Sequence, residues 1–157
     1  MKFVMLGLAA CLIALNAAAD DCPTLENMYF CASAKPKAPS QVRTFTQSKQ
    51  GDSTKFTLKV EGSDGSRSSV DYITDGAPQT RIEKGSDGKN LSVTEWATCE
   101  KGTLVISGNM PVPVFGNLSY TTEFTRTKAS DLAMHIVAKV SGGGSDDNVK
   151  CTLLNPP

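Results

Sequence analysis

The carboxylate of Glu95 is the group in this sequence whose position most suggests a role in ligand binding. It lies in residues 91–99, a β-type run in which strict alternation places it on the same face as the apolar side chains. An inward carboxylate needs a partner, and Arg126, in phase with Phe124 on a later run, is the candidate. Glu95 and Arg126 would then be the polar anchors of an internal ligand site.

A β-bulge just before Trp96 is the alternative arrangement of the same run. The bulge would turn Glu95 outward and Trp96 inward. Burying the indole removes more apolar area from water than burying the stem of a glutamate. The bulge is therefore the favoured interpretation, and it makes Trp96 an inner-face residue.

Catalytic and metal-binding chemistry finds little support in the remaining residues. The chain has a single histidine, His135, and alternation within residues 132–140 places it on the polar, outer face. No Gly-x-Ser-x-Gly or Cys-x-x-Cys motif occurs. The sequence thus predicts a protein that is not an enzyme, with no catalytic residues, no metal site and no cofactor.

An apolar segment, GNMPVPVFGN at residues 108–117, joins two of the β-type runs. Its large apolar side chains are Met110, Val112, Val114 and Phe115. Its two prolines cannot donate backbone hydrogen bonds, so residues 110–115 are not expected to form a central strand. Three roles stay open: a cover for one end of the core, a lid over a cavity, or an exposed contact surface.

Short runs with a period of two cover most of the chain. They occupy residues 42–47, 55–61, 69–74, 79–83, 91–99, 103–107, 118–128, 132–140 and 149–154. Three Asp-Gly pairs lie between runs, and Asp-Gly favours tight hairpins because glycine adopts a positive φ. The pattern predicts consecutive antiparallel hairpins.

Alternation also predicts which side chains face inward. The large inward ones are Phe56, Tyr72, Tyr120, Phe124 and Met134, opposite faces rich in Lys, Ser, Thr and Glu. Burial on one side is typical of antiparallel sheets. The fold class is therefore all-β, as a single antiparallel meander barrel of about eight to nine strands, with a two-sheet β-sandwich as the alternative.

The N-terminus has the pattern of a secretory signal peptide. Lys2 precedes an apolar run, and small residues follow at positions 17–19. The predicted organisation is a signal peptide at 1–19, a disulfide loop with a Pro/Ala linker at 20–40, and a barrel domain at 41–157. The product is expected to be secreted or periplasmic, with no transmembrane segment after cleavage.

Four cysteines remain after cleavage, and an oxidising compartment favours disulfides. Of three possible connectivities, the favoured one joins Cys22 to Cys31 in a short loop and Cys99 to Cys151. The chain carries 16 basic and 16 acidic residues without clustering, which argues against nucleic acid as a partner.

The size of the exported chain, its serial Asp-Gly turns and a cysteine in its last run resemble the calycin group over about residues 41–154. The Gly-x-Trp signature of typical lipocalins is absent, so no functional residue is carried over. The predicted barrel and the apolar 110–115 segment, together with this resemblance, suggest a lipocalin-like binding protein that sequesters a small apolar or amphipathic ligand inside the barrel. The protein is expected to be a monomer. Its candidate ligand-binding residues are Phe56, Tyr72, Glu95, Trp96, Tyr120, Phe124, Arg126 and Met134. A protein-interaction module, such as an inhibitor or cell-envelope component using the apolar 110–115 segment, is the alternative.

Overall fold

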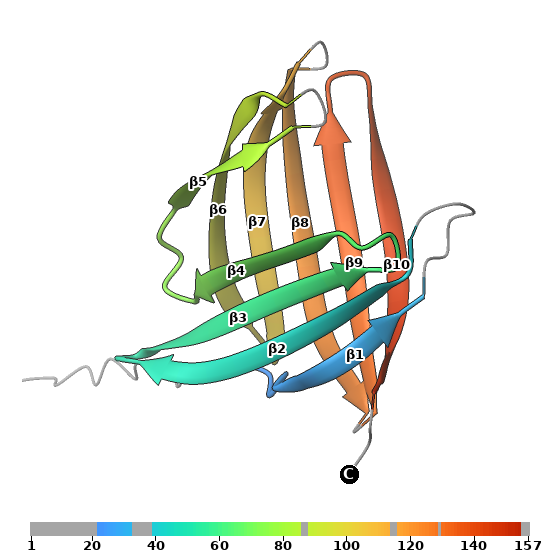
Figure 1. Ribbon diagram of the computed structural model, residues 1–157. Coiled ribbons are helices and arrows are strands. Elements are labelled where there is room, and N and C mark those ends of the chain that lie inside the picture. The colour runs from blue at the N-terminus through green and yellow to red at the C-terminus, as the bar shows by residue number, and fades with distance from the viewer. Residues whose placement is uncertain (1–21, 33–38, 86–87, 114–115, 129, 155–157) are drawn as a thin grey trace, which may run out of the picture.

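Ten β-strands form one antiparallel sheet that curls into a half-barrel (Figure 1). The computed structural model describes residues 22–32, 39–85, 88–113, 116–128 and 130–154, and no helix occurs in these ranges. The all-β prediction is thereby confirmed. No helix of this part of the chain is long and apolar enough to cross a membrane.

The strands follow one another along the chain with short connections. They are β1 (Asn27–Cys31), β2 (Gln41–Gln50), β3 (Ser53–Gly62), β4 (Arg67–Ile73), β5 (Gln79–Lys84), β6 (Asn90–Glu100), β7 (Thr103–Val112), β8 (Gly116–Lys128), β9 (Asp131–Val140) and β10 (Gly143–Leu153). Nine correspond to the nine runs that alternation predicts. The addition is β1, which lies in the segment assigned to the disulfide loop and linker.

The strand order is β4-β3-β2-β1-β10-β9-β8-β7-β6-β5, so the first and last strands are neighbours inside the sheet. Strands β4 and β5 are consecutive in the chain but form the two edges. The Asp75-Gly76 pair between them therefore makes no hairpin, contrary to the prediction. Instead Gly76, at a φ of 72°, donates its N–H to the carbonyl of Ala97 on β6 at 3.0 Å.

Strand β7 continues through Met110 and Pro111 to Val112, and so extends beyond the predicted run of residues 103–107. The pairing explains how a proline is accommodated. The ladder between β6 and β7 ends at Thr94 and Asn109, and beyond this point β7 pairs with β8 alone. Pro111 thus occupies a stretch that needs hydrogen bonds on only one side. Val114 and Phe115 lie outside the described residues.

The core fills the part of the half-barrel where β1–β4 face β6–β10. Its buried apolar side chains are Leu25, Tyr29, Cys31, Phe45, Phe56, Leu58, Tyr72, Ala97, Leu104, Ile106, Phe124, Leu132, Met134 and Cys151. Phe45 packs edge-on against Tyr29 and Phe124, with ring centroids 6.1 Å and 5.2 Å away. The inward orientation predicted from alternation is confirmed.

The disulfides join Cys22 to Cys99 and Cys31 to Cys151, so the predicted pairing is wrong. The reason lies in the extended backbone of β1, which ends at Cys31. An extended strand advances about 3.3 Å per residue and so carries Cys31 away from Cys22. Cys31 is instead the direct antiparallel partner of Cys151 on β10.

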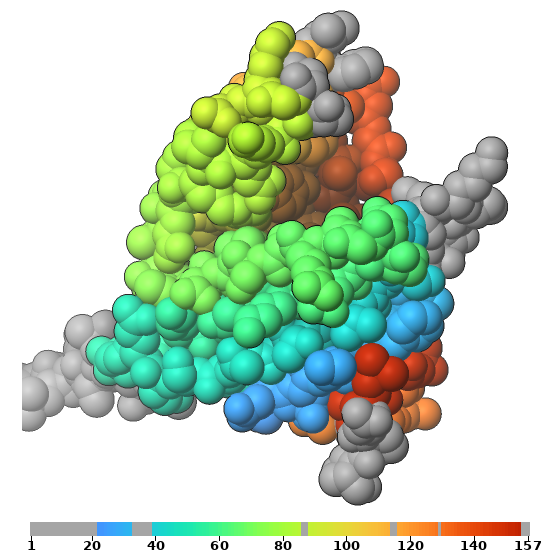
Figure 2. All heavy atoms as spheres, in the orientation of Figure 1, coloured from blue at the N-terminus to red at the C-terminus, as the bar shows by residue number. Residues whose placement is uncertain are grey.

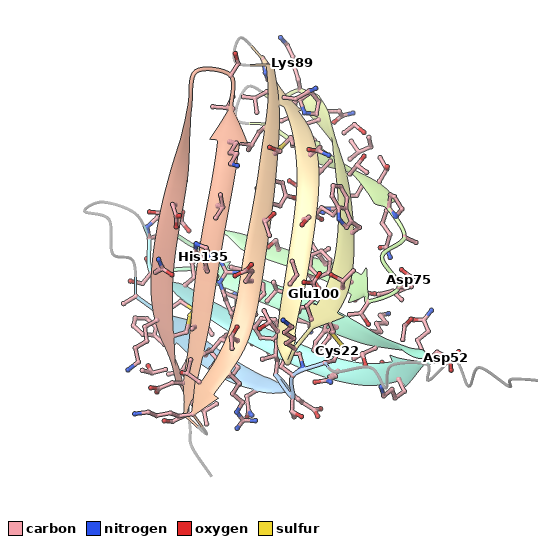
Figure 3. The ribbon with its side chains drawn as sticks, turned by 180° about the vertical axis from the view of Figure 1, so that it is seen from behind. Cys22, Asp52, Asp75, Lys89, Glu100 and His135 are labelled. Carbon is pink, nitrogen blue, oxygen red and sulfur yellow. A yellow bond between two sulfur atoms is a disulfide. The ribbon has the colours of Figure 1, made fainter. Side chains whose placement is uncertain are left out.

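His135 lies on the outer face of β9, as predicted (Figure 3). Its Nδ1 is 3.1 Å from Glu123 Oε2 on β8, and its Nε2 is 2.8 Å from Asp146 Oδ1 on β10. Hydrogen bonds to Asp146 and then Glu123 raise the pKa of His135 above its ordinary value of 6.5. The imidazolium thus links three neighbouring strands.

We expect His135 to stabilise the sheet in a pH-dependent way. Because its pKa is raised in the folded state, the stabilisation is fully present just below pH 6.5 and is lost as pH rises through the folded-state pKa. Urea unfolding of the wild type and of His135→Gln should therefore differ at pH 6 and converge at pH 8.5. A constant difference across this range would contradict a role for the imidazolium charge.

Candidate functional site

A groove separates the two edges of the sheet, between β4 on one side and β5 with β6 on the other (Figure 2). It encloses about 220 Å³. Its lining residues are Ser69, Val70, Asp71, Tyr72, Ile73, Gln79, Thr80, Arg81, Glu95, Trp96 and Ala97. The volume suits a small molecule, or one end of a larger one.

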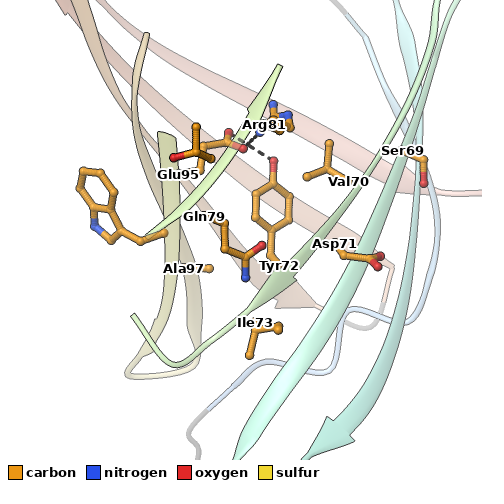
Figure 4. Close-up of a pocket in the computed structure, with 11 residues that line it drawn as sticks. Ser69, Val70, Asp71, Tyr72, Ile73, Gln79, Arg81, Glu95 and Ala97 are labelled. Atoms are coloured by element: carbon orange, nitrogen blue, oxygen red, sulfur yellow. Dashed lines mark hydrogen bonds and ion pairs between the residues drawn. The ribbon is translucent and has the colours of Figure 1, made fainter. Parts of the chain in front are cut away.

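Polar groups from four strands meet at Glu95, which is only 5% exposed. Tyr72 of β4 donates its hydroxyl to Glu95 Oε1 at 3.4 Å, and Tyr120 of β8 donates a second hydrogen bond to the same oxygen. Arg81 of β5 forms an ion pair with Glu95 Oε2. Figure 4 shows the Tyr72 hydroxyl directed at Glu95 and Arg81 from across the groove. We call Tyr72, Arg81, Glu95 and Tyr120 the polar cluster.

The two phenols of the polar cluster stay protonated at physiological pH. Burial raises the pKa of Tyr120 to about 12, and burial likewise raises the pKa of Tyr72. Both hydroxyls therefore remain hydrogen-bond donors to the carboxylate. Arg81 is oriented further by Glu83, whose Oε1 lies 2.7 Å from Arg81 Nη2.

Gly108 on β7 provides the space in which the polar cluster forms. It is the direct partner of Glu95 on β6 and of Tyr120 on β8. A Cβ at this position would lie 2.6 Å from Tyr120 Cζ and 2.9 Å from Glu95 Cγ. The absence of a side chain lets the phenol cross β7 to reach the carboxylate.

Gly108→Ala is expected to lower the free energy of unfolding by about 1–3 kcal/mol, because the new methyl group displaces the Tyr120 ring and Glu95. Urea unfolding measures the change. Gly143→Ala is the matched control, since a Cβ there meets nothing within 4 Å, and we expect it to be within about 0.5 kcal/mol of wild type. Equal effects of the two substitutions would contradict this role of Gly108.

The orientation of Glu95 corrects the favoured interpretation of its strand. The ladders of β6 with β5 and β7 run without a register shift, so there is no bulge at Trp96. Glu95 faces inward, and Trp96 is half-buried on the opposite face. The partner of Glu95 is Arg81 and not Arg126, whose Nη1 donates to the carbonyl of Thr24 at 3.2 Å.

The structure divides the predicted ligand-binding residues into groups. Tyr72, Glu95 and Tyr120 meet in the polar cluster, whereas Phe56, Phe124 and Met134 are covered by other core side chains. Arg81 and Gly108 belong to the site but are not singled out by the sequence. Arg81 is in phase with Gln79 and Glu83, whereas the one apolar residue of β5, Ile82, lies on the opposite face and is exposed. Alternation alone would therefore place Ile82 inside and Arg81 outside.

No protein-family model matches this sequence, and no curated protein matches it. Among the described residues, no group of three or more His, Cys, Asp or Glu side chains is placed to hold a metal ion.

Proposed function

We propose that this chain is an exported, non-enzymatic binding protein that holds a small amphipathic ligand in the groove between β4 and β5. The observation that carries the proposal is the polar cluster at the floor of that groove. Buried polar groups in an otherwise apolar interior are typical of sites that orient a ligand. The two disulfides and the signal-like N-terminus support export, and the half-barrel supports the calycin resemblance at the level of architecture.

The groove combines an apolar wall with hydrogen-bonding groups. Val70 and Ile73 of β4 and Ala97 of β6 supply apolar surface, while Tyr72 and Gln79 supply polar atoms. The core below it is packed, so the ligand is placed at the open edge of the half-barrel and not deep inside it. This placement changes the original expectation of a ligand surrounded by Phe56, Phe124 and Met134.

Fluorescence titration with N-phenyl-1-naphthylamine, a neutral amphipathic probe, tests the proposal. We expect one-to-one binding that also appears as added mass in native mass spectrometry. Gln79→Trp places an indole at the exposed rim of the groove and should weaken binding by about tenfold or more.

Thr46→Trp is the matched control for the indole. Thr46 is exposed on β2 and does not line the groove, so this variant should bind the probe like the wild type. Absence of binding to the wild type, or equal binding by all three proteins, would reject the groove as a ligand site.

A further inference from the structure

Arg43 on β2 is a charged side chain on the inner face of the sheet. It is in phase with Phe45 of the core, and its direct neighbours on β1 and β3 are Tyr29 and Val60. Its guanidinium lies over the ring of Phe124, 5.9 Å from the centroid. Arg43 thus lies at the boundary between the packed core and the open part of the half-barrel.

The guanidinium has few partners for a charge in this position. Its Nη2 donates to Gln41 Oε1 at 2.6 Å, and its buried Nε has no hydrogen-bond acceptor among the described residues. No carboxylate in the described part of the chain forms an ion pair with it, in contrast to Arg81, which has two. Burial lowers the pKa of Arg43 to about 10, so the side chain still carries its charge at neutral pH.

An arrangement of this kind costs folding free energy. A desolvated charge without a counter-charge is destabilising, and so is a buried donor without an acceptor. The neighbouring Tyr29 is a second buried donor without an acceptor, because its side chain is fully buried and its hydroxyl has no partner in the described residues. Both unpaired groups are hydrogen-bond donors, and an anionic oxygen is the acceptor that would complement them.

Arg43 is also close to the groove. Its partner on β3, Val60, pairs with Ser68 of β4, which lies on the same face of β4 as Val70 and Tyr72 of the groove lining. In the polar cluster the charges of Arg81 and Glu95 already balance, with Glu83 beside them. Arg43 is therefore the cation on this side of the sheet that has no negative partner among the described residues.

We propose that Arg43 binds the acidic group of the ligand, which makes the ligand an amphipathic organic anion such as a carboxylate, sulfonate or phosphate monoester. This inference rests on the proposed function, since it assumes that the apolar body of the ligand lies in the groove. The guanidinium supplies charge-assisted hydrogen bonds, and the ring of Phe124 holds its plane in position. The polar cluster then contacts the neutral polar part of the molecule.

Two probes that differ by one acidic group test the assignment. 1-Anilinonaphthalene-8-sulfonate carries a sulfonate on the same aromatic skeleton as the neutral N-phenyl-1-naphthylamine. We expect the wild type to bind the sulfonate more tightly than the neutral probe. Arg43→Gln should weaken sulfonate binding by about ten- to a hundredfold and change binding of the neutral probe by less than about twofold.

Arg67→Gln removes the same charge from an exposed arginine on the outer face of β4, whose side chain is 79% exposed. This control should bind both probes like the wild type. Arg43→Lys, which keeps the charge, should retain part of the preference for the sulfonate. Because Arg43 forms no ion pair with any described residue, Arg43→Gln is expected to unfold at the same urea concentration as the wild type or at a higher one.

The outcomes separate the two proposals. If the neutral probe binds but Arg43→Gln binds the sulfonate as tightly as Arg67→Gln does, the anion assignment is wrong and the groove remains a ligand site. If neither probe binds the wild type, both proposals are wrong. Displacement of the sulfonate probe by millimolar inorganic sulfate, at constant ionic strength, would show a site for free anions and would overturn the amphipathic assignment.

Discussion

Replacing Cys31 and Cys151 together by alanine is expected to lower the free energy of unfolding by about 5 kcal/mol, measured by urea denaturation. The bond joins residues 120 positions apart, so its loss frees a long loop of the unfolded chain. It also lies in the ladder between β1 and β10, where the first and last strands meet. Domains of this size are stable by about 5–15 kcal/mol, so the variant should approach the limit of folding.

The pair formed by Cys22 and Cys99 is the matched comparison. Its separation of 77 residues gives an expected loss of about 4.5 kcal/mol for the double alanine variant. Because the two loops overlap, the losses are not additive in the fourfold variant. A change below about 1 kcal/mol for Cys31→Ala with Cys151→Ala would show that this bond does not constrain the unfolded chain.

Peptide mapping without reduction distinguishes the connectivity of the structure from one that contains a Cys22–Cys31 bond. No Lys or Arg lies between Cys22 and Cys31, so trypsin leaves both in one peptide. The structure predicts one disulfide-linked species in which this peptide holds both the Cys99 peptide and the Cys151 peptide. A Cys22–Cys31 bond would give that peptide by itself, together with a separate pair of the other two.

Alternation along the sequence predicts nine of the ten strands because each depends on local spacing. It cannot give the sheet order, which depends on contacts between distant segments. Strand β1 shows this limit, since five residues that include Met28, Tyr29 and Phe30 carry little periodicity. The position of β1 between β2 and β10 also decides the disulfide partners and leaves β4 and β5 as edges.

The orientation of Glu95 cannot be predicted from the buried apolar area alone. Comparing Trp96 with Glu95 favours the indole as the inner residue, but the comparison omits what the carboxylate binds. Arg81 and two phenols compensate the desolvation of Glu95, and they come from strands whose neighbours the sequence does not reveal. Strict alternation alone gives the correct orientation.

The inward orientation of Arg43 can be predicted from the sequence. It lies two positions before Phe45, so alternation places it inside if Phe45 is inside. That no carboxylate of the described residues pairs with Arg43 emerges only from the folded arrangement.

Glu95→Ala is expected to lower the free energy of unfolding by about 3 kcal/mol and to abolish any preference of the groove for polar ligands. The substitution leaves two phenolic hydroxyls without their acceptor and removes one of the two counter-charges of Arg81. Breaking a buried ion pair by removing one partner costs about 3–5 kcal/mol, and the partial exposure of Arg81 places the effect at the lower end. Urea unfolding gives the stability, and titration with the two naphthylamine probes gives the binding.

Two further variants distinguish the ion pair from a general effect of losing a carboxylate. Glu83→Ala removes the more exposed partner of Arg81 and should cost less than about 1 kcal/mol. Glu95→Met combined with Arg81→Met removes both charges of the pair and should recover part of the stability lost in Glu95→Ala, because no guanidinium is left facing the interior and the more exposed Glu83 stays solvated. If Glu95→Ala were as stable as Glu83→Ala, the carboxylate would not be the centre of the polar cluster. If the double methionine variant were stable yet bound neither probe, the ion pair would be retained for ligand binding and not for folding.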